Sequence, residues 1–222
     1  MHPYITELQA LFQLHADPTR ALSAKAYLRN QFEFFGIPMP VRRKLSNEYR
    51  KQSLPPYPEI EGIMKSLFAL PEREFHYFGI ELLAGLKKQW TKETIRLMED
   101  LILTKSWWDT VDYMASAWCN PYFKKFPEQV VPVTGRWNQS NEMWLQRSSL
   151  LFQLKYKKDT DTRLLARYID KLSSSKEFFI QKAIGWCLRE YSKTDPSWVK
   201  RFIETHSLAN LSKREALKHL GN

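Results

Sequence analysis

The stretch WLQRSSLL at residues 144–151 recurs 35 residues later as FIQKAIGW at residues 179–186. Each copy begins with an aromatic residue, has a basic residue three positions later, and continues as a largely apolar helix-like run. A fainter copy, HYFGIELL, occupies residues 76–83, and Trp107 lies 37 residues before Trp144. Repeats of roughly 30–47 residues built from helix pairs stack into solenoids. The period therefore predicts an all-α solenoid.

The remainder of the chain favours helices as well. It has seven glycines in 222 residues, no Asn-Gly or Asp-Gly hairpin signal, and apolar residues at helical spacing. Helix starts are marked by N-cap residues followed by proline and by one capping box, at Asn120-Pro121, Asp195-Pro196 and Ser212 to Glu215. The length suits one domain spanning residues 1–222.

Composition narrows the class of protein. No apolar run approaches the ~20 residues that cross a bilayer, and the N-terminus lacks the layout of a secretory signal. The two cysteines, Cys119 and Cys187, form no CxxC pair, and the five histidines show no ligand spacing. We therefore expect a cytoplasmic protein without disulfides or a metal site.

Positive charge is concentrated toward the C-terminal third. The chain has a net charge of +10, and residues 147–222 contribute +8 of it, with 16 basic and 8 acidic residues. Such asymmetry favours a polyanionic partner, either nucleic acid or an anionic membrane. The alternative is a basic surface that only aids solubility.

The stretch SWWDTVD at residues 106–112 carries the candidate chemistry. With Ser106 as N-cap, Asp109 would fall at the third helical position and be explained by capping. Asp112 lies beyond the first turn, and it shares one helix face with Trp108, four residues earlier. One interpretation is a buried ion pair or a hydrogen bond to a neighbouring helix. The other is a carboxylate that faces a cationic target.

A single aspartate among aromatic faces fits one kind of reaction. Indole faces attract cations, and a carboxylate stabilises the positive charge that develops on a sugar ring during glycosidic cleavage. A purine alkylated at N3 or N7 is already cationic, so it leaves without being protonated. One carboxylate that also orients a water could therefore suffice, with no general acid beside it.

Positions equivalent in the repeats should face one groove, and these are Trp108, Asp112, Arg147, Lys182 and Trp186. The Arg147 fork suits a phosphate, although a salt bridge to Asp109 or Asp112 is a competing role. Trp186 by itself would usually be a core residue. Gly185 beside it permits either close helix packing or access to the backbone.

Four stretches together resemble the AlkD-like family of DNA alkylation repair glycosylases. They are FFGIPMPVRR at residues 34–43, SWWDTVD at 106–112, WLQR at 144–147 and AIGWCLRE at 183–190. The resemblance implies a right-handed α-α superhelix of HEAT-like repeats, an ARM-like fold. It also implies a bacterial cytoplasmic protein that works on the nucleoid DNA.

The resemblance further implies activity and roles. Members of the family are monofunctional glycosylases that excise positively charged N3- and N7-alkylated purines, such as 3-methyladenine and 7-methylguanine, from duplex DNA. This is the first step of base excision repair, and it needs no metal, cofactor or base flipping. The catalytic trio corresponds to Trp108, Asp112 and Trp186. Arg147 corresponds to a DNA-backbone contact, and Tyr27 to a residue near the site.

Weaker candidates for phosphate contacts are Lys155, Lys182 and Arg189, and a basic residue of this kind, taken alone, is more often a solvated side chain. We expect duplex DNA as the partner, no membrane, and a monomer. Two rival functions stay open. One is a non-catalytic helical-repeat protein that binds distorted or branched duplex DNA, and the other is a helical scaffold for a protein partner.

Overall fold

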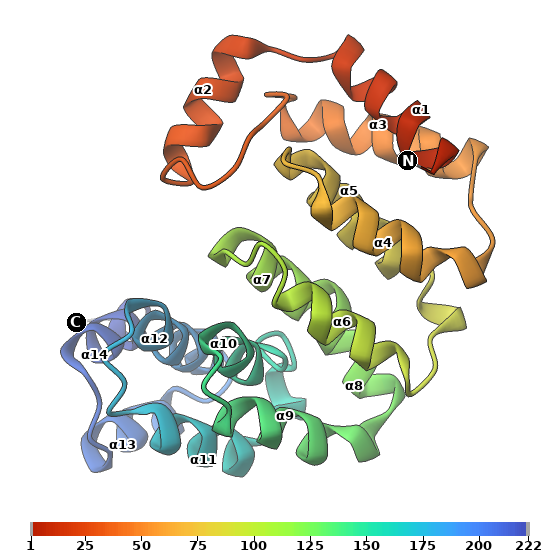
Figure 1. The fold of residues 1–222 in the computed structure, drawn as a ribbon. Coiled ribbons are helices and arrows are strands. Elements are labelled where there is room, and N and C mark those ends of the chain that lie inside the picture. The colour runs from red at the N-terminus through yellow and green to blue at the C-terminus, as the bar shows by residue number, and fades with distance from the viewer. Residues whose placement is uncertain (1, 221–222) are drawn as a thin grey trace. The chain divides into compact units, whose positions relative to one another are not determined.

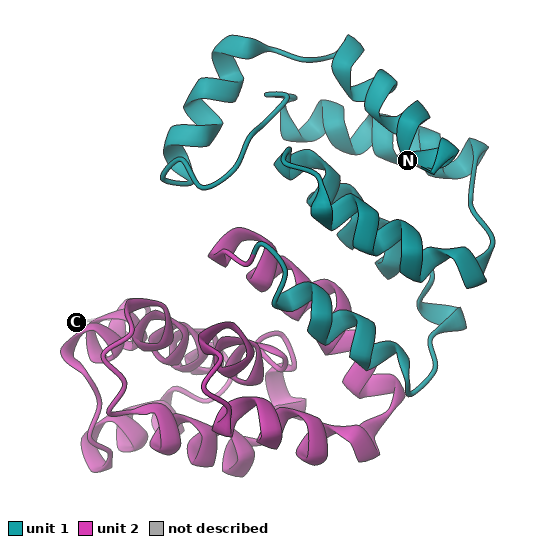
Figure 2. Cartoon of the chain, viewed as in Figure 1, with its two compact units in different colours: residues 1–105 teal, residues 106–222 magenta. Residues whose placement is uncertain are grey.

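The computed structural model describes residues 2–220, which fall into two compact units, residues 1–105 and 106–222 (Figure 2). Both units are built from helices, and no strand occurs among the described residues (Figure 1). The all-α class predicted from the repeats is therefore confirmed. Within residues 2–220, no helix combines the length and hydropathy needed to cross a membrane. The prediction of one domain stays a prediction.

Unit 1 packs its helices around a cluster of phenylalanines. Its helices are α1 (Pro3–Leu14), α2 (Pro18–Tyr27), α3 (Met39–Gln52), α4 (Ile60–Ala69), α5 (Arg73–Gly85) and α6 (Thr94–Ile102). The ring centroids of Phe12, Phe35 and Phe75 lie 5.4–5.9 Å apart, and the three side chains are almost fully buried. Aromatic contacts of this kind join α1, the loop before α3 and α5 into one core.

The loop before α3 is held by a buried carboxylate. Glu74 on α5 accepts hydrogen bonds from the backbone N–H groups of Phe35, Gly36 and Ile37 at 3.2, 2.9 and 3.3 Å. Gly36 has φ +82°, and a Cβ there would lie 2.2 Å from the Asp17 carbonyl oxygen. Glycine is therefore required at this turn, because any side chain would collide with the start of α2.

Unit 2 forms two rows of helices. It contains α7 (Trp108–Met114), α8 (Asn120–Lys125), α9 (Val130–Gln139), α10 (Met143–Leu151), α11 (Thr162–Leu172), α12 (Phe178–Ser192), α13 (Pro196–Thr205) and α14 (Asn210–Leu217). Helices α9, α11 and α13 form one row, and α10, α12 and α14 form the other (Figure 1). Helix α10 also packs on α7, and α12 packs between α10 and α14.

The 35-residue period corresponds to equivalent contacts in unit 2. WLQR opens α10 and FIQK opens α12. The Gln146 side chain donates to the Ser140 carbonyl oxygen at 2.6 Å, and Gln181 donates to the Ser175 carbonyl oxygen at 2.9 Å. The same glutamine therefore closes the same turn in both copies, as expected of a helical repeat.

Helix starts were predicted with mixed success. Asp195 caps α13, and its Oδ1 accepts from the Trp198 N–H at 2.8 Å, as predicted. Asn120 does not start a separate helix, because a π-helical stretch (Ala115–Cys119) leads directly into α8. The Asn120 N–H bonds to the Ala115 carbonyl oxygen five residues back. This wider turn immediately precedes Pro121, which has no N–H for the regular helical bond.

The proposed capping box at Ser212 is wrong. Helix α14 begins at Asn210, and the Ser212 hydroxyl donates instead to the Gln181 carbonyl oxygen on α12 at 2.8 Å. The polar groups of Ser212 and Glu215 both contact α12 instead of capping α14. The thiols of Cys119 and Cys187 are both buried, and neither forms a disulfide.

Gly185 permits the close approach of α12 and α14. A Cβ at this position would lie 2.4 Å from the Glu215 Cβ and 2.8 Å from the Ser212 carbonyl oxygen. Of the two roles left open for this glycine, close packing is the one observed.

The Gly185→Ala variant is expected to lose about 1–3 kcal/mol of stability, because backbone must move to admit the methyl group. This corresponds to a fall of several degrees in Tm, measured by thermal unfolding. Gly62→Ala is the matched control, because nothing lies within 4 Å of the added methyl and alanine favours the α4 helix. Equal Tm values for the two variants would contradict the packing role.

Candidate active site

Asp112 and Arg147 form a two-pronged ion pair within unit 2. Arg147 Nε donates to Asp112 Oδ1 at 2.7 Å, and Nη2 donates to Oδ2 at 2.8 Å. The Arg147 side chain is 5% exposed and the Asp112 side chain is 17% exposed. Of the alternatives left open by the sequence, an ion pair to the neighbouring helix is present. The Asp112 side chain nevertheless keeps part of its surface exposed to solvent.

The ion pair leaves part of the carboxylate available. An ionised carboxylate offers about four acceptor sites, and Arg147 occupies one on each oxygen. No further hydrogen bond to the Asp112 carboxylate occurs among the described residues. Asp112 can therefore still accept a hydrogen bond from a water or stabilise a nearby cation.

Burial and the arginine act in opposite directions on Asp112. Burial raises the pKa of the Asp112 carboxyl, whereas the hydrogen bonds and charge of Arg147 lower that pKa. Asp109, on the same helix, adds a small upward effect. The net shift is upward, so Asp112 takes up a proton more readily than an ordinary aspartate.

Helix α7 presents Trp108 and Asp112 one turn apart. Trp107 rather than Ser106 is the N-cap residue, so α7 starts at Trp108 and Asp109 lies in its first turn. Trp108 and Asp112 are both partly exposed, and their four-residue spacing places them on one face of the helix. The shift of the cap by one residue leaves this predicted pairing intact.

An aromatic cluster underlies the ion pair, and its role was missed from the sequence. The ring centroids of Trp107, Trp144 and Phe179 lie 5.1–5.9 Å from one another. They come from the start of α7, α10 and α12, and the Phe179 carbonyl oxygen accepts the third hydrogen bond of Arg147. The cluster therefore fixes the backbone that holds the guanidinium. Its signal was present in the sequence, as the aromatic residue that opens each repeat.

Trp186 differs from the packing tryptophans. Trp118, Trp137 and Trp90 are buried, as expected of core residues. Trp186 is only partly buried, and its indole forms no hydrogen bond or aromatic ring contact among the described residues. Its neighbour Cys187 ties α12 to α10 through the Leu150 carbonyl oxygen at 3.2 Å. An indole with this freedom can receive a ligand.

Arg147 is placed to support Asp112 rather than to reach solvent. All three of its nitrogens are hydrogen-bonded, two of them to Asp112. The arginine is thus a positioning residue in this geometry. The phosphate contact expected from the sequence stays a prediction.

The other predicted DNA-binding residues occupy different environments. Lys182 and Arg189 are partly exposed and form ion pairs with Glu215 on α14. Lys155 is exposed and forms no ion pair within the described part of the chain. Tyr27 ends α2 in unit 1 and is exposed. These side chains are accessible, and their contact with DNA stays a prediction.

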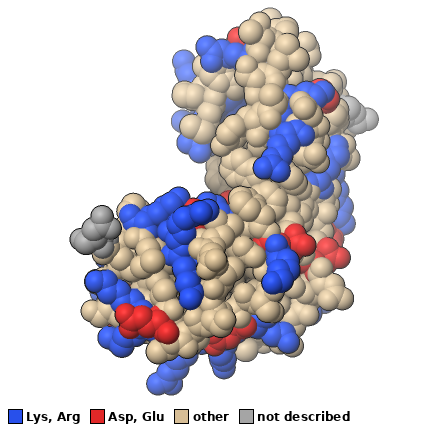
Figure 3. All heavy atoms as spheres, turned by 90° about the vertical axis from the view of Figure 1, so that its left-hand side faces the viewer, with Lys and Arg blue, Asp and Glu red and all other residues tan. Residues whose placement is uncertain are grey.

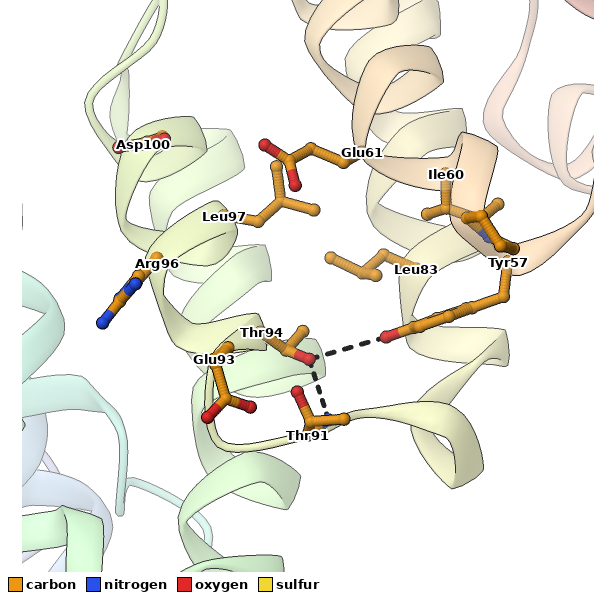
Figure 4. A pocket seen from close by; sticks show the side chains of 11 residues that line it. Tyr57, Ile60, Glu61, Leu83, Thr91, Glu93, Thr94, Arg96, Leu97 and Asp100 are labelled. Atoms are coloured by element: carbon orange, nitrogen blue, oxygen red, sulfur yellow. Dashed lines mark hydrogen bonds between the residues drawn. The ribbon is translucent and has the colours of Figure 1, made fainter.

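A separate cavity of about 510 Å³ lies in unit 1 (Figure 4). Tyr57 Oη and Thr94 Oγ1 approach to 3.5 Å at its wall, and Glu61, Glu93 and Asp100 give it acidic character. None of the predicted site residues lines this cavity. No group of three or more histidine, cysteine, aspartate or glutamate side chains in residues 2–220 could hold a metal ion.

Comparison with known proteins agrees with the fold. Residues 8–220 match the family described as DNA alkylation repair enzyme. A solved structure from Enterococcus faecalis, described as a predicted DNA alkylation repair enzyme, is 31% identical, with a TM-score of 0.88. The similarity covers 94% of this chain and 98% of that one. No curated protein matches. The helical-repeat fold class is thereby confirmed, and the chain belongs to the DNA alkylation repair enzyme family.

Proposed function

We propose that this protein is a monofunctional DNA glycosylase. It hydrolyses the N-glycosidic bond of positively charged N3- and N7-alkylated purines in duplex DNA, and it releases bases such as 3-methyladenine and 7-methylguanine. The observation that carries the proposal is Asp112, whose side chain is partly exposed and whose carboxylate is held in place by Arg147. The family of the chain supports DNA repair as the setting, here the first step of base excision repair.

The proposed reaction requires little from the protein beyond charge and orientation. The bond between C1′ and the purine nitrogen breaks, and its electron pair leaves with the base, which becomes neutral. The positive charge passes to the sugar, where Asp112 stabilises it. A water adds to C1′ and loses a proton to solvent, which leaves an abasic site.

Trp108 and Trp186 would supply aromatic faces on either side of this carboxylate. A cationic base or an oxocarbenium-like sugar is attracted to the face of an indole. Trp108 shares a helix face with Asp112, and Trp186 lies on α12, which packs against the helix of Arg147. The two indoles thus favour a charged lesion over a neutral base.

Basic residues would hold the duplex. Lys and Arg atoms cover more of the face shown in Figure 3 than Asp and Glu atoms do. Lys155, Lys182 and Arg189 are candidate phosphate contacts, with Tyr27 as a further contact. Binding of this kind weakens steeply as salt rises. We expect a monomer that acts in the cytoplasm without a metal or cofactor.

The test is release of free base from duplex DNA that carries 7-methylguanine or 3-methyladenine, measured by chromatography. We expect time-dependent release and an accumulating abasic site. Duplex binding without release would favour the non-catalytic DNA-binding alternative. Little affinity for DNA, with no dependence on salt, would instead favour a scaffold for a protein partner.

A further inference from the structure

Glu215 is a buried carboxylate that holds three basic side chains. Its Oε1 lies 2.8 Å from Lys182 Nζ and 2.7 Å from Lys218 Nζ, and its Oε2 lies 2.9 Å from Arg189 Nη1. The Glu215 side chain is 5% exposed, whereas Lys182, Arg189 and Lys218 are 34%, 23% and 49% exposed. The negative charge is therefore beneath and the positive charges face outward. This group, the Glu215 cluster, has a net charge of +2.

Close helix packing puts Glu215 in this position. Gly185 lets the Glu215 Cβ approach α12, and the Ser212 hydroxyl bonds to the Gln181 carbonyl oxygen one turn away. Burial alone would raise the pKa of Glu215, but the two lysines lower that pKa to about 2. The carboxylate is thus ionised at neutral pH and keeps the three cations together.

The cluster lies on the same row of helices as the candidate active site. Residues 112, 147, 182 and 215 are spaced by 35, 35 and 33 positions and lie on α7, α10, α12 and α14. Asp112 pairs with Arg147, and Lys182 pairs with Glu215. Helices α10 and α12 are neighbours. The two ion pairs therefore join successive helices of the same row.

The cations have hydrogen-bond donors to spare. A lysine ammonium carries three N–H groups and an arginine guanidinium five. Within the cluster each of these side chains makes one ion pair, with Glu215. The unused donors can meet a phosphate, for which clustered lysine and arginine are the usual partners in proteins.

We propose that Glu215 preorganises Lys182, Arg189 and Lys218 as a binding site for a backbone phosphate of duplex DNA. The proposal rests on the proposed function only in taking DNA as the ligand. Glu215 acts here as a positioning residue, and Lys218 is a phosphate-binding residue that the sequence did not suggest. Removing the negative charge of Glu215 should therefore weaken DNA binding, although the protein becomes more positive.

The test measures binding of an undamaged, fluorescently labelled duplex by anisotropy at several salt concentrations. Glu215→Gln is expected to raise Kd by roughly tenfold, about the loss of one charge-assisted hydrogen bond. The dependence of log K on log salt should become shallower by about 0.9 for each phosphate that the variant no longer neutralises. Glu177→Gln is the matched control, because it makes the same charge change at an exposed position that starts α12. Its Kd should stay the same or fall.

A folded Glu215→Gln protein that binds DNA as tightly as the wild type, or more tightly, would overturn the proposal. Should this variant fail to fold, Lys218→Met carries the test, and an unchanged salt dependence would be the contrary result. A wild-type protein that does not bind duplex would also overturn it. Base release is measured separately. Weaker binding by Glu215→Gln together with no base release by the wild type would therefore contradict the glycosylase function and leave the phosphate site supported.

Discussion

Asp112→Asn is expected to reduce release of alkylated purines by at least about 10²-fold, the magnitude typical of losing one electrostatic stabiliser. Asparagine has nearly the same shape, and its carbonyl oxygen can still accept a hydrogen bond from Arg147. It carries no negative charge, however, so the developing sugar cation loses its stabilising partner. Affinity for undamaged duplex should be unchanged. Single-turnover release and anisotropy measure the two quantities.

The control for this variant is Asp109→Asn, the same chemical change in the first turn of α7. It should retain base release. Wild-type rates in Asp112→Asn would show that the catalytic assignment is wrong. Equal losses in both variants would point to a general effect on the helix rather than to the carboxylate.

Arg147→Met is expected to have the second large effect, on both stability and pH dependence. The change leaves Asp112 mostly buried without a counter-charge, and breaking such a pair costs about 3–5 kcal/mol. Because the arginine lowers the pKa of Asp112 against the effect of burial, its removal raises that pKa further. The reaction needs the ionised carboxylate, so activity is lost as pH falls through this pKa. The acid limb of the release profile should therefore move to higher pH.

Thermal unfolding and the pH profile of single-turnover release check this expectation. Arg147→Lys, which keeps the charge but loses the two-pronged geometry, should shift the acid limb by a smaller amount. An unchanged pH profile combined with weaker DNA binding would contradict the positioning role. That result would favour the phosphate contact expected from the sequence.

Local patterns in the sequence predicted the class of fold and the residues of the candidate site. Aromatic residues at a 35-residue period marked the starts of α10 and α12, and Asp195 before a proline marked α13. Trp108 and Asp112 share a face because helical geometry relates residues four apart. These features depend only on neighbours in the chain. They are therefore readable before any tertiary contact is known.

Side-chain contacts between helices could not be predicted from local sequence patterns. The Ser212 and Glu215 pattern satisfies a capping box locally, yet both side chains serve α12 instead. Arg147 had three competing partners on sequence grounds, namely a phosphate, Asp109 and Asp112.

The sequence by itself determined a helical-repeat protein with an aspartate and an indole on one helix face. Only the tertiary structure decided that Arg147 pairs with Asp112 and that Glu215 gathers three cations. The physical reason is that these ion pairs join residues 26 to 35 positions apart in the sequence. The exception is Lys218, which lies three residues from Glu215 and adds to the same cluster. Such partners are chosen by how closely two helices pack, and that closeness depends on residues such as Gly185.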